Sequence, residues 1–326
     1  MSCIPSSPPS ISAVPAGNKR PQWSVMVPVF NAGPYLGDAL RSVLAQSAPT
    51  DEMQICVVDD ASTDIDVRAL VESIGQGRVE YFRHPRNIGS VANFNQCLEL
   101  ARGQWVHLLH ADDRVLPGFY SAIGDLFTRY PQAGAAFSRH RHIDSEGVEQ
   151  LVTEPELQGR GLIPDWLTKL AVEQRLQYAS IAVRRDVYEE LGGFFGVSFG
   201  EDWEMWLRIA SRYPFAYTSE TLADYRVHSA SITGAKLRSG QNIEDLLWVV
   251  RTTASYLPIE VRTSVEKRAS KAIAAEAVRS AARLWRVGGD LVAARRQLTG
   301  ALALGCPARM LWPALKLYIR LLLVGR

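Results

Sequence analysis

Apolar, strand-like runs alternate with helical segments over the first third of the sequence. Residues 23–30 are β-branched and apolar and end at Asn31, Gly33 and Pro34, as a buried parallel strand does. The apolar positions that follow recur at helical spacing. Three further strands and their helices are expected at 54–58, 79–82, 91–100, 105–110 and 119–127. This β-α-β-α order predicts an α/β fold with a mostly parallel sheet and helices on both faces.

The rest of the chain divides into three expected regions. Residues 1–22 are rich in Ser and Pro and are expected to form a disordered tail. Residues 23–238 form the α/β domain, which includes a late strand at 221–227. Beyond Gln241 only helical patterns occur, so 239–326 is expected to be a basic, all-helical C-terminal extension.

Charge is distributed unevenly along the chain. The formal net charge is only +2, yet residues 261–326 hold 13 Lys and Arg against 3 Asp and Glu. A peripheral contact of 261–326 with an anionic membrane is one explanation, and packing on the acidic domain or between subunits is the alternative. The four cysteines form no C-x-x-C pair, and no signal peptide or spanning segment is evident. A cytoplasmic location, including the inner face of the membrane, is expected.

Two pairs of acidic residues follow predicted strands. In parallel sheets, ligands bind beyond the carboxyl ends of the strands. Asp112 and Asp113 suit Mg²⁺ or Mn²⁺, which prefer carboxylate and phosphate oxygens; a helix cap is the alternative. Asp59 and Asp60 could accept hydrogen bonds from a base or ribose, or form an Asx turn.

A third acidic pair, Glu201 and Asp202, precedes an amphipathic helix. Its position favours either a general base or simple interaction with the helix dipole. His228, which follows Tyr225 and Arg226, is by itself more typical of a structural histidine.

Taken in order, these segments resemble the family-2 glycosyltransferases of the GT-A fold. The similarity covers residues 23–235. It rests on the segments VMVPVFNAGPYLGDALRSVLAQS (25–47), VVDDASTD (57–64), NIG (87–89), LELARGQWVHLLHADD (98–113), VRRDVYEELGGF (183–194), GEDWEMWLR (200–208) and YRVHSASIT (225–233).

The resemblance implies a metal-dependent, inverting transfer of a sugar from a nucleotide-sugar donor to a hydroxyl acceptor. It implies Asp202 as the catalytic base, with Glu201 and Trp203 near the acceptor. For the metal, Mg²⁺ or Mn²⁺, it implies Asp113, Asp112 and His228. The donor-binding residues that it implies are Pro28, Val29, Phe30, Asp59, Asp60, Asn87, Gly89, Asp112 and Arg226.

The expected partners are a nucleotide-sugar donor, with a UDP-sugar as the default, and a glycan or lipid-linked acceptor in polysaccharide assembly; no nucleic acid is expected. One departure stands out, because many relatives have D-x-D-D where this chain has His110-Ala111-Asp112-Asp113. The Q-x-x-R-W motif of processive synthases is absent, which favours single additions.

Two other enzyme classes compete with this interpretation. Residues 196–200 match the G-x-S-x-G of serine hydrolases, with Asp224 and His228 downstream. However, 192–195 make a poor strand, and an Asp and a His four residues apart are cramped for a triad. A sugar-nucleotide nucleotidyltransferase would need a basic, Gly-rich loop after the first strand, and 29–36 contain neither Lys nor Arg.

Overall fold

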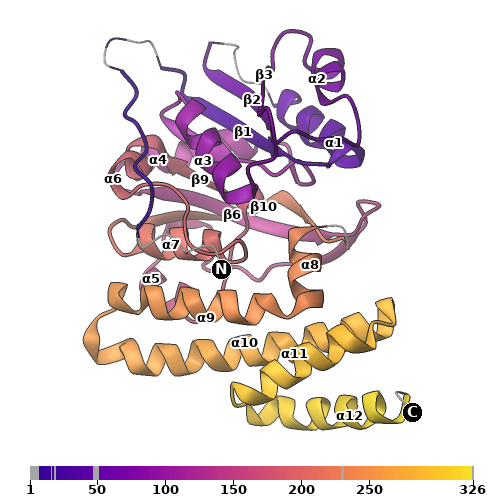
Figure 1. Cartoon of the computed structure of the whole chain (residues 1–326). Helices are drawn as coiled ribbons and strands as arrows, with labels where there is room; N and C mark the ends of the chain where they lie inside the picture. The colour runs from indigo at the N-terminus through magenta and orange to yellow at the C-terminus, as the bar shows by residue number, and fades with distance from the viewer. Residues whose placement is uncertain (1–6, 16, 18–19, 47–50, 229–230, 325–326) are drawn as a thin grey trace. The chain divides into compact units, whose positions relative to one another are not determined.

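The computed structural model describes residues 7–15, 17, 20–46, 51–228 and 231–324. Its contacts divide the chain into two compact units (Figure 1). Unit 1 consists of Met1–Trp166, Leu176–Gly196 and Arg212–Val227. Unit 2 consists of Leu167–Arg175, Val197–Ser211 and His228–Arg326.

Unit 1 is built on a ten-stranded sheet. Eight strands follow the order β3-β2-β1-β4-β9-β6-β10-β5, while β7 pairs with β6 and β8 with β10. The strands are β1 (Trp23–Val29), β2 (Met53–Asp59), β3 (Glu80–Arg83), β4 (Trp105–Leu108), β5 (Arg114–Val115), β6 (Ala135–Ile143), β7 (Glu149–Val152), β8 (Arg160–Leu162), β9 (Ile181–Arg184) and β10 (Phe215–Arg226).

The pairing places several strand ends at one edge. β1, β2, β3 and β4 pair in parallel, and so do β6 and β10. Because β9 is antiparallel to both β4 and β6, these two groups run in the same direction. We call the side where these six strands end the carboxyl edge. Asp59, Asp113 and Arg226 come at or just after strands that end there, so the mixed sheet keeps the parallel geometry that positions a ligand site.

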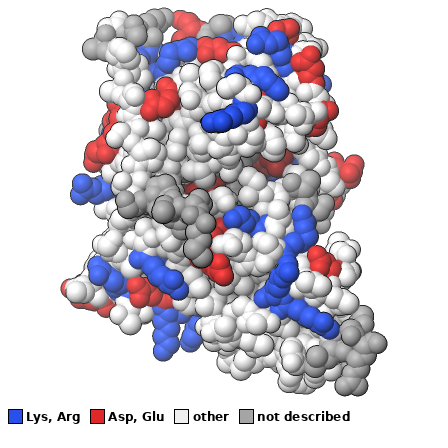
Figure 2. Space-filling view, viewed as in Figure 1, with Lys and Arg blue, Asp and Glu red and all other residues white. Residues whose placement is uncertain are grey.

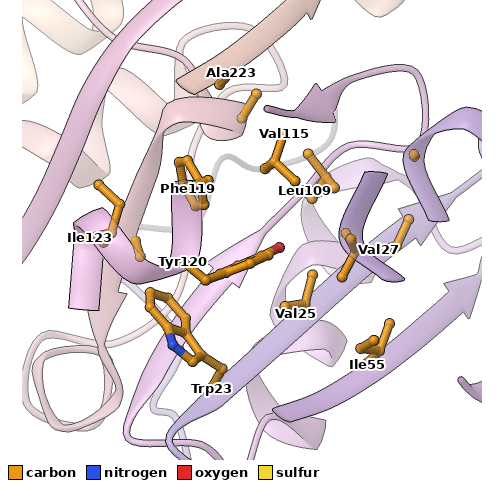
Figure 3. Close-up of a cluster of buried hydrophobic side chains, with 14 of the residues drawn as sticks. Trp23, Val25, Val27, Ile55, Leu109, Val115, Phe119, Tyr120, Ile123 and Ala223 are labelled. Carbon is orange, nitrogen blue, oxygen red and sulfur yellow. The ribbon is translucent and has the colours of Figure 1, made fainter. Parts of the chain in front are cut away.

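The core of unit 1 lies under the central strands. All seven residues of β1 and all seven of β2 are buried, as expected for strands covered on both faces. The Trp23 ring meets Tyr120 at 5.0 Å and Trp105 at 5.1 Å between ring centroids, both edge to face. Figure 3 shows Trp23 and Val25 of β1 close to Tyr120, with Val27 further along the same strand. This packing fixes β1 and β4, and therefore the turns that follow them.

The helices of unit 1 have one buried face each. α1 buries Leu36, Ala39, Leu40 and Val43, the helical spacing that the sequence predicted. The Asp66 side chain caps α2 by accepting a hydrogen bond from the Ala69 amide. The helices are α1 (Gly33–Leu44), α2 (Val67–Gly75), α3 (Ser90–Leu100), α4 (Phe119–Arg129) and α6 (Arg185–Leu191); α5 (Trp166–Leu170) continues into unit 2.

The N-terminal segment differs from the disorder expected for residues 1–22. Ile11 is buried, and the Gly193 amide donates to the Pro9 carbonyl. The buried Arg185 guanidinium donates to the carbonyls of Ser12 and Ala101. Apolar contact and satisfied hydrogen bonds thus hold residues 8–14 on unit 1 despite their Ser- and Pro-rich composition; residues 1–6 lie outside the described part of the chain.

Unit 2 is helical over its described residues, as expected for 239–326. The division nevertheless differs from a boundary near residue 238, because the helix that follows Gly200 groups with the C-terminal helices. The helices are α7 (Glu201–Ala210), α8 (Ile232–Ser239), α9 (Gln241–Thr253), α10 (Ile259–Gly288), α11 (Leu291–Ala303) and α12 (Ala308–Val324). Within the described ranges, no helix combines the length and the apolar character needed to cross a bilayer.

Candidate active site

Asp113 occupies the turn between β4 and β5 at the carboxyl edge and is 1% exposed. Its Oδ1 accepts a hydrogen bond of 2.8 Å from the Arg226 amide. Its Oδ2 is buried and has no hydrogen-bond partner in the described part of the chain. Burial and then the charge of Asp112 raise the pKa of Asp113 well above its usual value. An unsatisfied buried carboxylate oxygen is costly, and a cation removes that cost.

His110 joins the acidic pair. One ligand atom from each of His110, Asp112 and Asp113 can be chosen so that all three lie within 4.8 Å of one another. The His110 ring lies 5.0 Å from Phe94 and 4.3 Å from Tyr178 between centroids, which fixes its plane. Its Nε2 is buried without a hydrogen-bond partner among the described residues, and burial lowers its pKa, so the ring is neutral. Two carboxylates and a neutral imidazole suit a divalent cation.

Arg226 holds the acidic turn in place. Its Nε donates to the Asp112 carbonyl at 2.8 Å, and its Nη1 donates to the carbonyls of Asp144 and Ser145 at 3.1 and 3.0 Å. The guanidinium also lies 4.6 Å from the Tyr35 ring centroid. These hydrogen bonds to backbone carbonyls hold the turn that carries Asp112 and Asp113, and the expected role of Arg226 in donor binding stays a prediction.

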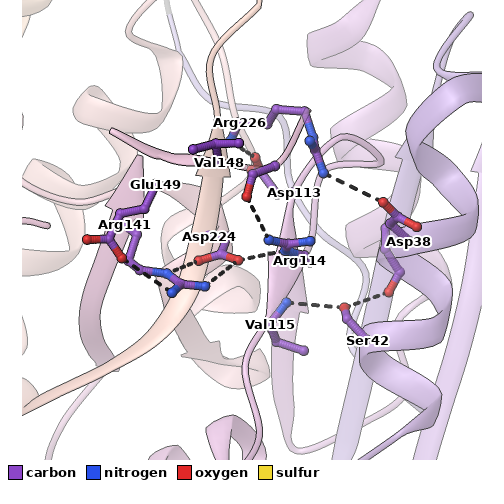
Figure 4. Close-up of polar contacts among 12 residues, drawn as sticks. Asp38, Ser42, Asp113, Arg114, Val115, Arg141, Val148, Glu149, Asp224 and Arg226 are labelled. Atoms are coloured by element: carbon purple, nitrogen blue, oxygen red, sulfur yellow. Dashed lines mark hydrogen bonds and ion pairs between the residues drawn. The ribbon is translucent and has the colours of Figure 1, made fainter. Parts of the chain in front are cut away.

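A buried cluster of charges lies beside this turn, and the sequence did not predict it. Asp224 is fully buried and accepts from Arg114 Nε and Arg141 Nε, both at 2.6 Å. Arg141 also approaches Glu149 at 3.4 Å (Figure 4). Because both Asp224 oxygens are held by guanidinium groups, Asp224 cannot orient a histidine as a hydrolase triad requires.

The two carboxylates at the end of β2 have different partners. Asp59 accepts from the Ser62 amide, from the Tyr81 hydroxyl at 2.7 Å and from Arg83. Burial opposes ionisation of Asp59, but these hydrogen bonds and the Arg83 charge prevail and lower its pKa. Asp59, expected at the donor, is therefore engaged in fixing the loop at 60–64 and strand β3.

Asp60 links two segments that the sequence placed in the donor site. Its Oδ1 accepts from the Ile88 amide at 2.7 Å, and its Oδ2 accepts from the Gly89 amide at 3.0 Å. The Asn87 side chain also accepts from the Gly89 amide. Gly89 has φ of 90°, a conformation that favours glycine, and it precedes helix α3. Asp60, Asn87 and Gly89 are therefore brought together at the carboxyl edge.

The residues that end β1 separate into buried and exposed groups. Val29 is buried and pairs in register with Asp59. Phe30, the next residue, is 51% exposed. Asn31 then bonds to the 62–63 loop through its amide and its side chain, with a φ of 50°. The chain thus presents an exposed aromatic ring beside the turn that holds Asp60.

In unit 2, Asp202 lies in the first turn of α7 and is 9% exposed. Its Oδ2 accepts from Gln174 Nε2 at 2.6 Å, and its Oδ1 accepts from the Trp203 amide at 2.7 Å. Burial raises the pKa of Asp202 to about 6, against the two hydrogen bonds. A carboxyl group with that pKa suits general base catalysis near neutral pH. No sequence pattern points to Gln174, which precedes Asp202 by 28 residues.

The neighbours of Asp202 are fixed within the same unit. The Trp203 indole donates to the Leu170 carbonyl at 2.8 Å, and Glu201 is buried at the start of the helix. Gly200 has φ of 91°, and a Cβ there would lie 3.2 Å from Leu246. The helix start is therefore held by contacts on both sides, which limits the movement of Asp202.

His228 and Ser198 complete the residues named from the sequence. The His228 carbonyl accepts a hydrogen bond of 2.9 Å from the Ser231 side chain, and the expected role of His228 at the metal stays a prediction. Ser198 lies in an irregular segment, and residues 192–195 before it form no strand. The nucleophile elbow of a serine hydrolase is therefore not formed here.

Comparison with known proteins assigns the chain to a family. The family model described as "Glycosyl transferase family 2" matches residues 24–192, more than half of the chain. The putative teichuronic acid biosynthesis glycosyltransferase TuaG of Bacillus subtilis is 38% identical over 99 residues, which cover 30% of this chain and 38% of that protein.

Two solved structures share the fold. TarS 1-349 of S. aureus in complex with UDP-GlcNAc superposes with a TM-score of 0.59 at 14% identity, over 87% of this chain and 90% of that one. The mannosyltransferase PcManGT of Pyrobaculum calidifontis, in complex with GDP-Man and Mn²⁺, gives 0.56 at 21% identity, over 97% and 83%. The chain has the GT-A-type fold expected from its sequence, and it is a glycosyltransferase that belongs to glycosyl transferase family 2.

Proposed function

We propose that this enzyme transfers a sugar from a nucleoside-diphosphate donor to a hydroxyl acceptor with inversion, and that it requires a divalent cation. The observation that carries the proposal is the buried Oδ2 of Asp113, which has no hydrogen-bond partner among the described residues and lies beside Asp112 and His110. Nucleotide-sugar complexes of TarS and PcManGT support the class of donor.

Asp112 and Asp113, with His110, are the residues that would hold Mg²⁺ or Mn²⁺. A cation held there would supply charge stabilisation for a diphosphate leaving group. Arg226 keeps these carboxylates in place through the Asp112 carbonyl and its own amide. His228 is the further ligand that we propose from its place in the YRVHS motif.

Asp202 is the proposed base. With a pKa of about 6 it is mostly ionised at pH 7, and its two hydrogen bonds orient the carboxylate. It removes the proton of the acceptor hydroxyl as the oxygen attacks the anomeric carbon. One base suffices, because the diphosphate leaves without protonation, in contrast to the paired carboxyls of glycoside hydrolases. Glu201 and Trp203, in the same helix turn, are proposed to contact the acceptor.

The nucleoside would bind along the ends of β1 and β2. Asp60 and the 87–89 loop form one wall of this region, and the exposed Phe30 ring offers a surface for the base. Pro28 and Val29 set the end of β1, and Asp59 acts indirectly by fixing the loop. A UDP-sugar is the proposed donor, and polysaccharide assembly on a glycan or lipid-linked acceptor is the proposed context, as the name of TuaG suggests.

A thermal-shift panel tests the proposal without knowledge of the acceptor. The protein is mixed with UDP, GDP, ADP and CDP, each with Mn²⁺, with Mg²⁺ and with EDTA. A ligand at 100 times its Kd stabilises by about 2.7 kcal/mol, which gives a clear shift. We expect one nucleotide to act only with metal and to lose its effect in Asp113→Asn. The absence of any nucleotide effect, or an effect unchanged by EDTA, would refute the proposed donor site.

A further inference from the structure

Helix α12 carries an apolar surface that the rest of unit 2 leaves uncovered. The helix packs against α10 and α11 through Ala314, Leu317 and Leu321, which are buried. Five large apolar residues of the helix are each at least 47% exposed. They are Leu311, Trp312, Leu315, Tyr318 and Ile319. Large exposed apolar groups gathered on one element mark an interaction surface.

The exposed residues form one continuous stripe. At about 100° per residue, these five positions fall within an arc of roughly 120°. The buried residues occupy an arc of roughly 60°, whose centre lies about 130° from the centre of the stripe. α12 therefore has a second apolar face that points away from its helical neighbours.

A basic arc adjoins the apolar stripe. Arg309, Lys316 and Arg320 are exposed and fall together next to Trp312 and Ile319 on the helix circumference. α12 contains no acidic residue. The Lys316 ammonium lies 4.8 Å from the Trp312 ring centroid. A helix with apolar, aromatic and basic faces side by side has the pattern of helices that lie in a membrane interface.

The surrounding sequence strengthens this charge pattern. Residues 261–326 hold 13 Lys and Arg against 3 Asp and Glu. Figure 2 shows Lys and Arg side chains over the orange helices of Figure 1, while the area of the yellow helix α12 is largely uncharged in this view. Such a surface attracts an anionic layer of lipid headgroups, whereas a neutral protein partner would make no favourable electrostatic interaction with these charges.

We propose that α12 binds the surface of an anionic phospholipid bilayer, with the stripe 311–319 inserted at the interface and the three basic residues on the headgroups. Over its described residues, α12 is not long and apolar enough to cross a bilayer. A lipid surface fits this helix better than a protein partner does, because basic residues that complement anionic headgroups and an exposed apolar stripe occur together on the same short helix. This inference is independent of the donor site, which lies in unit 1.

Vesicle flotation of the full chain tests the proposal. Vesicles of neutral phosphatidylcholine are compared with vesicles containing 30% phosphatidylglycerol, at low and at high salt. We expect anionic vesicles to bind at least tenfold more tightly, because each basic residue near an anionic surface contributes roughly fivefold. High salt should weaken binding without abolishing it, since apolar insertion is not screened.

Two double variants separate charge from apolar contact. Lys316→Gln with Arg320→Gln should weaken binding to anionic vesicles by at least tenfold, and Leu315→Gln with Ile319→Gln should weaken it at every salt concentration. All four positions are exposed, so the fold should persist, which circular dichroism checks. The matched control is Lys271→Gln with Arg286→Gln. These substitutions remove the same amount of charge from two exposed positions of α10.

Three outcomes would overturn the proposal. Equal loss of binding in the α10 control would assign the effect to total charge. Absence of binding to anionic vesicles by the wild-type chain would refute a lipid occupant outright. A wild-type dimer in light scattering that becomes monomeric in Leu315→Gln with Ile319→Gln, without vesicle binding, would assign the stripe to a second copy of the chain.

Discussion

Replacing Asp202 with Asn should make the protein more stable at alkaline pH while strongly reducing its activity. Burial raises the pKa of Asp202 from 3.8 to about 6 in the folded chain. The folded state therefore binds the proton more tightly than the unfolded state. The stability linked to this group is fully present below about pH 4 and is lost as the pH rises towards 6.

The size of the effect follows from the pKa difference. A shift of about two units corresponds to about 3 kcal/mol, by which ionised Asp202 destabilises the wild type at pH 8. Asn keeps the size and the hydrogen-bonding atoms but carries no charge. The expected gain is therefore about 3 kcal/mol at pH 8 and about 1 kcal/mol at pH 4.5.

Urea unfolding at the two pH values measures this gain. The matched control is Glu244→Gln, which removes an exposed acid from the first turn of α9 and should give little difference between the two pH values. If the variant is no more stable than wild type at pH 8, or if its gain in stability does not depend on pH, then burial does not make the ionised form of Asp202 unfavourable in the folded state.

Three further substitutions test other contacts. Gln174→Met removes the hydrogen bond to ionised Asp202, so the acidic limb of the kcat-versus-pH profile should move up by about one pH unit. An unchanged acidic limb would mean that the ionisation of Asp202 does not determine it. In His110→Gln, Mn²⁺ affinity by calorimetry should fall about tenfold or more, and an unchanged affinity would remove His110 from the cation site. Asp224→Asn keeps one acceptor oxygen but removes the buried charge that Arg114 and Arg141 contact, so urea unfolding should show a loss of about 1.5–3 kcal/mol; a loss below about 1 kcal/mol would contradict the buried cluster.

Much of the fold is predictable because local patterns and topology agree. The buried apolar runs of β1, β2 and β4 and the spacing of α1 and α4 determine the parallel half of the sheet. The strands β6 and β9 are less evident. β6 includes Ser138, Arg139, His140 and Arg141, whose polarity hides a strand in a sequence pattern. Their pairing depends on residues distant in sequence, which no local pattern reveals.

The candidate site shows the same division. The acidic pairs were predictable because they follow strands that end at one edge. Gln174, Arg114 and Arg141 were not, since each acts through a partner 28 or more residues away. His110 departs from the D-x-D-D pattern but stands two residues before the acidic pair, and the geometry groups its ring with Asp112 and Asp113. Likewise, the Pro- and Ser-rich composition of the first residues predicts disorder. The contacts that order them, such as Arg185 to Ser12, join residues far apart in sequence and leave no local pattern.

The most direct test of the central claim is nucleoside diphosphate release from a panel of UDP- and GDP-sugars, with water as the acceptor. The account predicts that Mn²⁺ or Mg²⁺ supports turnover of one donor and that EDTA abolishes it. It also predicts that Asp202→Asn still binds the donor but is slower by about 10²–10⁴-fold. Undiminished turnover in EDTA, or a rate for Asp202→Asn within about threefold of wild type, would contradict a metal-dependent transferase that uses Asp202 as its base.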